Sequence, residues 1–367
     1  HLILKVGLDK FLELVAAEQN AVSNDRIEVE TKNFRTSKQS RTAPVVEITD
    51  QSDYLAWREH NVYRQKQDGL FAIGIKVRLG DFYTPEARKL GDLIRDFAGD
   101  ELRLTINQGI LIRDVRETSL PFFYKQLKEL NFTDLGVNSM ADVTSCPGTD
   151  TCNLGIASST GMAKELEKTI AEEFPQFINN KDIAIKISGC MNACGQHSIA
   201  QIGFYGMSIK NGKHVIPAFQ VLLGGGNSGN GRGRFADKII KIPSKRGPQA
   251  LRLLIHDYKR YQLLKEPFNH FYLRKGKDHF YQLLKPLADL SKADQDLMID
   301  WGHDEAYIKA IGVGECAGVV IDLVTTLLFE CEEKLEKAKW SLEEKKWANS
   351  IYHSYSALVN TAKAVLI

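Results

Sequence analysis

The sequence has no excess of charge of either sign. It contains 48 lysine and arginine residues and 46 aspartate and glutamate residues, which give a formal net charge of +2. Nucleic-acid-binding domains usually carry a strongly basic surface, so no nucleic-acid partner is expected. Long hydrophobic runs are also missing. The longest, AGVVIDLVTTLLF at 317–329, contains Asp322 and is shorter than the ~20 residues that a membrane helix needs, so no membrane span is predicted.

Repeats, low-complexity tracts and a signal peptide are absent too. The chain starts with His1 where an initiator methionine is expected, and HLILKVGLDKFLELV at 1–15 has the pattern of an amphipathic helix. The last residues, SALVNTAKAVLI, stop within a helical pattern that no glycine or proline ends. We therefore expect the sequence to be part of a longer chain.

Cysteine is scarce, with six residues among 367. A chain of this length that is 43% hydrophobic can bury two or three cores without the help of disulfide bonds. Free thiols persist in a reducing compartment, so a cytoplasmic location is expected. Four of the six cysteines lie within 49 residues, and this clustering is the strongest functional signal in the sequence.

The first part of the chain is expected to hold a small sheet covered by helices. An apolar stripe at helical spacing and a polar stretch after it assign 1–48 to a helix and a linker. Between 69 and 130 the pattern is strand, helix, strand, strand, helix, and the helix at 84–99 has Thr84 as its expected cap. That order is typical of a ferredoxin-like α+β half-domain, which we place at 49–135.

The next part, 136–290, is expected to form a mixed α/β module. Its predicted elements are a helix at 158–174, strands at 182–189, 199–210 and 214–225, and a loop that leads into a helix within 242–261. Both pairs of clustered cysteines then fall in loops at the ends of these elements. Residues 300–367 form a separate all-α module in this interpretation, and Cys316 and Cys331 fall on its apolar helical faces, where burial is the expected role.

The spacing of the clustered cysteines narrows the metal that they can hold. Cys146 and Cys152 form a C-x5-C pair. After 37 intervening residues, Cys190 and Cys194 form a C-x3-C pair. Structural zinc usually takes C-x2–4-C pairs, so the first pair is too wide for it. A four-iron cluster accepts wider spacing because each thiolate holds a different corner, and the neighbouring glycines allow close backbone approach.

Two alternatives stay open on spacing alone. The four thiols could be structural, because cysteine is among the residue types most often fully buried. They could also belong to a zinc-stabilised binding module that has no enzymatic activity and carries an appended helical interaction domain. Visible absorbance and metal analysis would separate both alternatives from an iron–sulfur site.

Three segments carry a resemblance to a known family: TSCPGTDTCNLG (144–155), KISGCMNACGQHSIAQIGFYG (186–206) and QVLLGGG (220–226). Together they resemble the signature of the sirohaem- and iron–sulfur-dependent nitrite and sulfite reductases. The similarity extends from residue 1 to about residue 275. Met191 and Gly109 depart from the residues that are usual in the family, but neither change touches a cysteine.

The resemblance implies a 4Fe–4S cluster held by Cys146, Cys152, Cys190 and Cys194. It also implies that Cys194 is the catalytic cysteine, since this thiolate ligates the sirohaem iron as well as the cluster. A shared thiolate couples the two cofactors through bonds, and ligation, hydrogen bonds and burial then set their potentials. Cys190 is expected to serve the cluster alone.

Sirohaem carries many carboxylates, so its pocket should offer cations and amides. Gln108 and Asn192 lie inside the matching motifs, and Asn192 is expected to face the macrocycle. Arg103 and Arg113 are the other expected contacts. Further candidates are Arg64, Lys66, Arg232, Arg234, Lys245 and Arg246. His197 is expected to support the nearby cysteines rather than to bind metal.

The resemblance further implies a six-electron reduction of sulfite to sulfide or of nitrite to ammonia. We favour sulfite, although no motif separates the two anions. Ferredoxin or a flavoprotein subunit is the expected electron donor. The family's chain has another half before the equivalent of residue 1, and the basic residues that bind the anion are expected there.

The last helical residues lie outside this resemblance. YHSYSALVNTAKAVL at 352–366 faintly resembles one helix of a HEPN-type bundle, and a packing or oligomerisation module is the simpler interpretation. Deletion of 300–367 is therefore expected to leave reductase activity intact.

Overall fold

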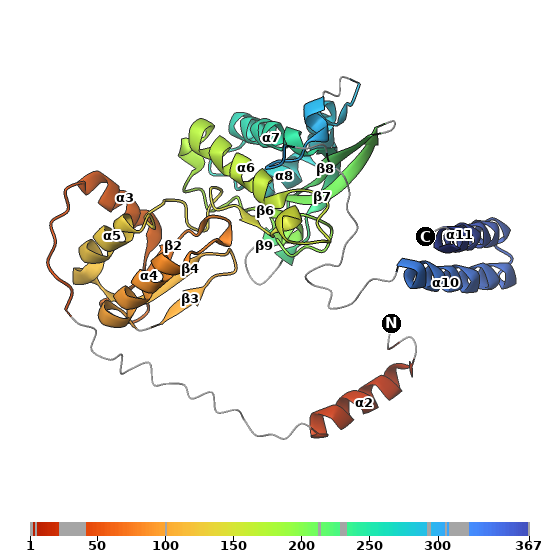
Figure 1. The fold of residues 1–367 in the computed structure, drawn as a ribbon, viewed down its shortest axis with the longest axis horizontal. Coiled ribbons are helices and arrows are strands. Elements are labelled where there is room, and N and C mark those ends of the chain that lie inside the picture. Colours follow the sequence, from red (N-terminus) through yellow and green to blue (C-terminus); the bar gives the residue numbers. More distant parts are fainter. Residues whose placement is uncertain are drawn as a thin grey trace.

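The computed structural model describes residues 3, 6–21, 42–99, 101–211, 214–227, 233–291, 295–304, 307 and 323–365. Figure 1 shows a smaller and a larger α/β domain joined by the chain near residue 135, with helices α10 and α11 forming a separate pair. No helix within the described residues is long and apolar enough to cross a membrane. The architecture is the expected mixture of an antiparallel sheet, a mixed sheet and C-terminal helices.

The smaller domain packs three helices on a four-stranded antiparallel sheet whose order is β1-β2-β4-β3. Its elements are α3 (Gln51–Asn61), β1 (Val62–Arg64), β2 (Leu70–Ile75), α4 (Thr84–Phe97), β3 (Leu102–Leu104), β4 (Ile110–Arg116) and α5 (Leu120–Glu129). Trp57, Ile73, Ile112 and Phe123 lie in its core. Helix α4 begins where predicted, but Tyr83 is the N-cap and makes no side-chain capping bond, so Thr84 already belongs to the first turn.

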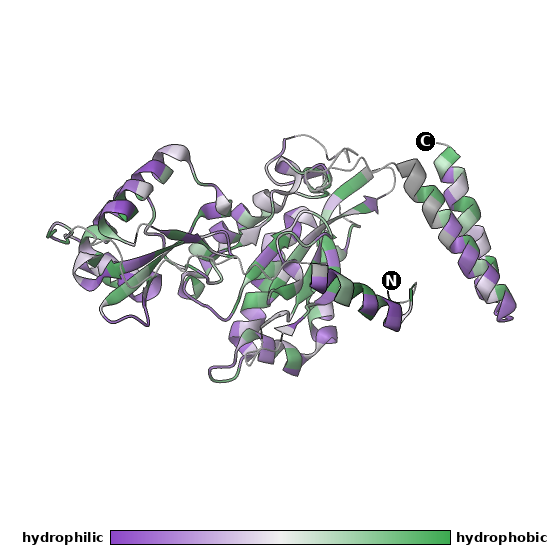
Figure 2. Ribbon diagram, turned by 90° about the horizontal axis from the view of Figure 1, so that it is seen from below, coloured by the Kyte–Doolittle hydropathy of each residue, from purple (hydrophilic) through white to green (hydrophobic). Residues whose placement is uncertain are grey.

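The larger domain is built on a five-stranded mixed sheet whose order is β11-β8-β7-β6-β5. Its elements are β5 (Thr144–Ser145), α6 (Ser159–Glu173), β6 (Ile185–Ser188), β7 (Ile202–Asn211), β8 (His214–Leu223), β9 (Gly226–Asn227), β10 (Gly233–Arg234), β11 (Asp237–Pro243), α7 (Gly247–Tyr261), α8 (Phe268–Lys275) and α9 (Lys277–Leu284). β5, β6 and β7 run parallel, whereas β7, β8 and β11 pair antiparallel. Hydrophobic residues concentrate in this sheet, as Figure 2 shows.

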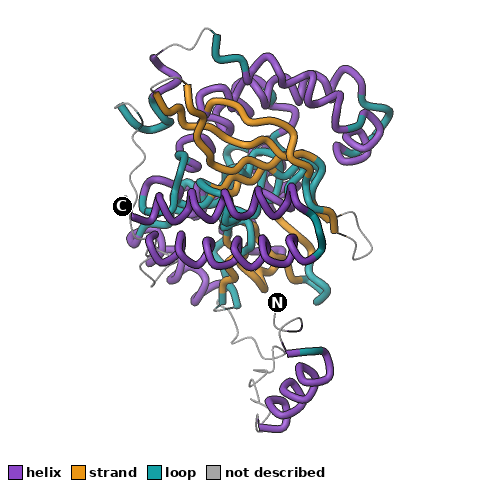
Figure 3. Tube along the Cα trace, turned by 90° about the vertical axis from the view of Figure 1, so that its right-hand side faces the viewer, coloured by secondary structure: helices purple, strands orange, loops and turns teal. Residues whose placement is uncertain are grey.

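Two further parts complete the described chain. α2 (Leu8–Ala21) is the predicted N-terminal helix, and α10 (Leu323–Glu343) and α11 (Trp347–Val365) form a hairpin whose helices lie side by side in Figure 3. Small residues fill the seam of the hairpin, including Ala338, Ser350 and Ala357, all of which are buried. Cys331 is half-buried, with its Sγ 3.0 Å from Thr361 Oγ1. Cys316 lies outside the described residues.

Candidate metal centre

Cys146 and Cys190 follow two neighbouring parallel strands. β5 pairs with β6 through Ser145 and Ile187, and each cysteine comes just after the carboxyl end of its strand. The backbone N–H of Cys146 donates to the Ile187 carbonyl oxygen at 3.1 Å. Ligands of α/β sheets bind at this edge, where the loops after parallel strands meet. The β5–β6 pairing therefore brings one cysteine of each sequence pair to the same edge.

The loop that carries Cys152 returns to the same place. The N–H of Cys152 donates to the Gly148 carbonyl oxygen at 3.0 Å. The N–H groups of Ile156 and Ala157 then donate to the Gly189 carbonyl oxygen at 2.8 and 3.1 Å. Gly189 immediately precedes Cys190, so the segment after Cys152 is tied to the loop of the second pair.

Glycines allow these backbones to meet. A Cβ atom on Gly189 would lie 2.6 Å from the Gly148 Cα, and one on Gly206 of β7 would lie 2.0 Å from the Gly189 carbonyl oxygen. Both distances are impossible for a real side chain. The sequence indicates close backbone approach at the glycines beside the cysteines. It does not single out Gly206, although glycine within a strand commonly marks close backbone approach.

Ser188 holds the loop of Cys194. Its Oγ accepts the N–H of Gly195 at 3.0 Å and lies 2.8 Å from Nδ1 of His197. His197 is buried, and burial together with Lys238 lowers its pKa to about 4. The imidazole is neutral near pH 7, so one of its two ring nitrogens carries the proton, and Nδ1 shares a hydrogen bond with the Ser188 hydroxyl. The buried ring also packs against Tyr205, with 4.9 Å between the ring centroids. These contacts suit a residue that stabilises the Cys194 loop.

The cysteines differ in exposure. Cys190 is buried, Cys146 and Cys152 are half-buried, and Cys194 is exposed together with its neighbour Asn192. The N–H of Gly189 donates to the Sγ of Cys146 at 3.0 Å, so a backbone donor from the second cysteine loop reaches the sulfur of the first. In the part of the chain described by the structure, no three His, Cys, Asp or Glu side chains group closely enough to hold one metal ion. A site for a single zinc ion is therefore not preformed there.

The Gln108 side chain hydrogen-bonds to the backbone of Ser145, next to Cys146. Its Nε2 donates to the Ser145 carbonyl oxygen at 2.7 Å, and its Oε1 accepts the Ser145 N–H at 3.1 Å. The amide thus pairs with the edge of β5 as another strand would. Gln108 comes from the turn between β3 and β4, so this contact also docks the smaller domain on the cysteine loops.

The predicted arginine contacts lie on that smaller domain. Arg103 of β3 is exposed, and Arg113 of β4 lies beside Asp114 at 3.9 Å. Arg103 pairs with Leu111, and Leu111 and Arg113 are two residues apart, so the pleat places both arginines on one sheet face. This is the face opposite the core residue Ile112.

Several of the further cations are engaged elsewhere. Arg234 donates to the Gly224 carbonyl oxygen at 3.0 Å and pairs with Asp237. Arg246 donates to the carbonyl oxygens of residues 287 and 289 at 2.7 and 2.6 Å. Lys245 lies over the Trp301 ring at 4.3 Å. Arg64 and Lys66 are exposed, and Arg232 lies outside the described residues. The structure thus gives Arg234, Lys245 and Arg246 roles in packing.

Comparison with known proteins agrees with this arrangement. Residues 63–130 match the nitrite/sulfite reductase ferredoxin-like half domain, and residues 136–290 match the nitrite and sulphite reductase 4Fe-4S domain. The two matches together cover more than half of the chain. The chain belongs to the nitrite and sulfite reductase family. These two matches confirm the predicted family.

Individual relatives of the family are distant. An assimilatory ferredoxin-dependent nitrite reductase of Haloferax mediterranei is 23% identical over 279 residues, which are 72% of this chain and 45% of the relative. A chloroplastic ferredoxin–nitrite reductase of Zea mays is 29% identical and covers 54% of this chain and 35% of its own. The NADPH sulfite reductase hemoprotein beta-component of Staphylococcus carnosus is 28% identical, with 66% of this chain and 41% of its own covered.

A solved structure shows the same fold. The Mycobacterium tuberculosis NirA protein superposes with a TM-score of 0.52 at 24% identity, over 65% of this chain and 42% of that one. The chain spans less than half the length of each of these four proteins. The reductase family and fold are therefore shown, and the activity is a matter for proposal.

Proposed function

We propose that Cys146, Cys152, Cys190 and Cys194 bind a 4Fe–4S cluster and that Cys194 also ligates a sirohaem iron. The observation that carries this proposal is the meeting of the cysteine loops around Gly189. The N–H of Gly189 donates to Cys146, and its carbonyl oxygen accepts two N–H groups of the segment that follows Cys152. Cys190 is the next residue in the sequence. Backbone N–H donors and a glycine-lined approach suit a polynuclear cluster.

The exposure of the cysteines supports the division of roles between them. Cys190 is buried and suits a ligand that serves only the cluster, whereas exposed Cys194 can meet a second cofactor. Asn192 is exposed on the same loop and suits a contact with the macrocycle. Gln108 acts on this site through Ser145, and Arg103 and Arg113 remain proposed contacts for the carboxylates of sirohaem.

When bound, the two cofactors would supply electron transfer to an anion, and the reaction would be the six-electron reduction of sulfite or nitrite. Relatives named as nitrite reductases and as sulfite reductases both match the chain, so the proposal covers both anions. Their names likewise include ferredoxin and NADPH as sources of electrons. Steady-state rates with each anion, measured with reduced methyl viologen, decide the substrate.

The test of the proposed site is anaerobic reconstitution with iron, sulfide and sirohaem. We expect visible absorbance from both cofactors and four cluster irons plus one haem iron for each chain. Cys190→Ser should lose the cluster, Cys194→Ser should lose both the cluster and the haem band, and the matched control Cys331→Ser should lose neither. A colourless protein with one zinc per chain would instead support the zinc-stabilised binding module.

A further inference from the structure

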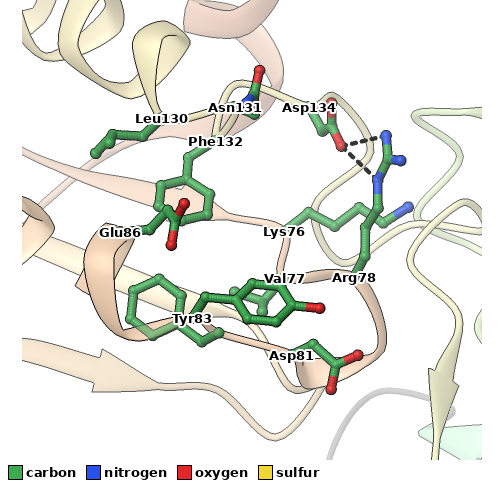
Figure 4. Close-up of a pocket in the computed structure, with 11 residues that line it drawn as sticks. Lys76, Val77, Arg78, Asp81, Tyr83, Glu86, Leu130, Asn131, Phe132 and Asp134 are labelled. Carbon is green, nitrogen blue, oxygen red and sulfur yellow. Dashed lines mark hydrogen bonds and ion pairs between the residues drawn. The ribbon is translucent and has the colours of Figure 1, made fainter.

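A pocket on the smaller domain leads to a buried lysine. The pocket has a volume of ≈ 430 Å³ and lies between the segment after β2 and the residues that follow α5. Figure 4 shows Asp81, Glu86 and Asp134 around it, with Asp134 paired to Arg78 at 2.8 Å. Lys76 lines the same pocket, and its side chain extends away from it. Water in the pocket thus reaches the stem of Lys76.

Lys76 ends among acidic groups of the larger domain. Its Nζ pairs with Glu167 Oε1 of α6 at 2.9 Å and donates to the Ala141 carbonyl oxygen. Only 7% of the Lys76 side chain and 16% of the Glu167 side chain are exposed. Glu167 also accepts the N–H of Val143 at 3.2 Å, which fixes it beside the strand that leads to Cys146. This ion pair therefore joins the two domains just before the first cysteine.

Asp142 sits in the same buried group. Its Oδ2 accepts the N–H of Asn138 at 2.8 Å. Burial raises its pKa to about 6, with Glu167 adding to the rise, while the Asn138 N–H, Lys76 and Lys186 oppose it. These groups come from the loop of Asp142 itself, from α6, from β6 and from the segment after β2. Asp142 thus changes its charge close to neutral pH.

Lys186 connects this group to the second pair of cysteines. It lies on β6, is buried, and donates to Asn107 Oδ1 at 2.7 Å and to Gln196 Oε1 at 3.1 Å. Gln196 is two residues beyond Cys194. Burial lowers the pKa of Lys186, and the negative charge of Asp142 opposes this shift. Two cations and two carboxylates, all with little exposure, therefore lie beside the segment before Cys146 and the segment after Cys194.

We propose that Lys76, Asp142, Glu167 and Lys186 form a buried charge network in which Asp142 takes up one proton when one electron reaches the cysteine site. The electron comes from the external donor, the proton comes from water through the pocket, and the Asp142 carboxylate becomes a carboxylic acid. No other bond changes. The proposal rests on the proposed function, because it needs a redox centre between these cysteines.

The expected size of the coupling follows from distance. Asp142 lies four residues before Cys146, so at most about 13 Å of extended backbone separates them. At an effective dielectric constant of about 20, one added electron at that distance raises the proton affinity of a carboxylate about tenfold. The two events are linked, so the same factor favours reduction of the site when Asp142 is protonated.

The test is the midpoint potential of the reconstituted cluster, followed by electron paramagnetic resonance during dye-mediated titration with dithionite between about pH 5 and about pH 8. The wild-type potential should fall as pH rises through the range of the Asp142 pKa, by a total of about 59 mV for a tenfold coupling. Asp142→Asn should give a flat profile. The matched control Asp182→Asn, which alters an exposed carboxylate of the same domain, should keep the wild-type profile.

Lys76→Met provides a second variant should Asp142→Asn fail to fold. Lys76 lowers the pKa of Asp142, so its removal should move the pH-dependent range of the potential to higher pH. A flat wild-type profile, a pH-dependent Asp142→Asn profile or an unmoved Lys76→Met profile overturns the network. A protein that binds no cluster overturns the proposed function and the network together, whereas a bound cluster with a flat profile overturns the network alone.

Discussion

The backbone N–H of Gly189 donates to the Sγ of Cys146 across 3.0 Å, although the two residues lie 43 positions apart in the sequence. This bond joins the two cysteine pairs, and it forms because β5 and β6 are parallel neighbours. A hydrogen bond to sulfur stabilises the thiolate, which is the form that binds iron. The contact therefore links the order of the strands to the chemistry of the site.

Gly189→Ala should disrupt the site. The added Cβ would lie 2.6 Å from the Gly148 Cα, so the cysteine loops must separate, and we expect a loss of about 1–3 kcal/mol in the free energy of unfolding. Iron bound after reconstitution should fall with it. The matched control is Gly91→Ala in α4, where a Cβ meets nothing within 4 Å and a more stable helix is expected. Equal iron content in Gly189→Ala and wild type would contradict this account of the loops.

Gln108→Ala should loosen the contact between the domains. The substitution removes two hydrogen bonds to the backbone of Ser145 and leaves that strand edge unpaired, at a cost of about 1–3 kcal/mol. Faster hydrogen exchange at Ser145 and Cys146 is the measurement. Gln126→Ala, which removes only a 3.4 Å bond to Glu129 within α5, is the matched control and should change neither stability at the domain contact nor exchange at Ser145. Unchanged exchange at Ser145, whose N–H donates to Gln108, would mean that Gln108 does not hold β5.

Spacing and flanking glycines in the sequence point to the loops that carry the predicted ligands, and the pairing of β5 with β6 brings two of these loops to one sheet edge. Helix α4 is predicted from its first residues. The sequence does not predict the buried lysines because Lys76, just after β2, and Lys186, in β6, lie in segments that alternate apolar and charged residues, a pattern that places charges in solvent. Here the second domain covers that face of each strand, and only the tertiary fold shows it. α8 and α9 are not predicted because each has only eight residues and no side-chain cap, whereas α3 is not predicted although Asp50 caps it.

The C-terminal boundary of the larger domain also depends on tertiary contacts that the sequence does not reveal. Buried Asp300 accepts the N–H of Ser158, the N-cap of α6, at 2.7 Å and the hydroxyl of Ser244 at 2.6 Å. The Trp301 indole donates to the Ser244 carbonyl oxygen at 2.9 Å. Deletion from residue 300 was expected to be harmless, but these contacts place residues 300 and 301 within the larger domain.

Two truncations test whether the larger domain ends before or after Asp300. A chain that ends at residue 299 loses Asp300 and leaves the Ser158 N–H unpaired and buried, so we expect about 2–4 kcal/mol of lost stability and weaker iron binding. A chain that ends at residue 307 keeps these contacts and should match the full chain in both respects. Thermal unfolding and iron content measure the difference. Equal stability of the two truncations would show that Asp300 contributes nothing to α6.

His197 should make stability depend on pH in a defined direction. Its pKa is about 4 in the folded protein, whereas a histidine of an unfolded chain titrates near ~6.5. The unfolded state therefore binds the proton first as pH falls. The stabilisation is complete above about pH 6.5 and is lost as the pH falls from there towards about 4.

His197→Gln should remove this part of the pH dependence, because glutamine does not titrate. Urea unfolding midpoints at about pH 7 and about pH 5 should differ less for the variant than for wild type, although the variant is less stable at about pH 7, where the bond to Ser188 is lost. His270→Gln changes an exposed histidine and should keep the wild-type difference. The same difference in His197→Gln and wild type would mean that the His197 ring is not held neutral by burial, and its place beside Ser188 would then need another explanation.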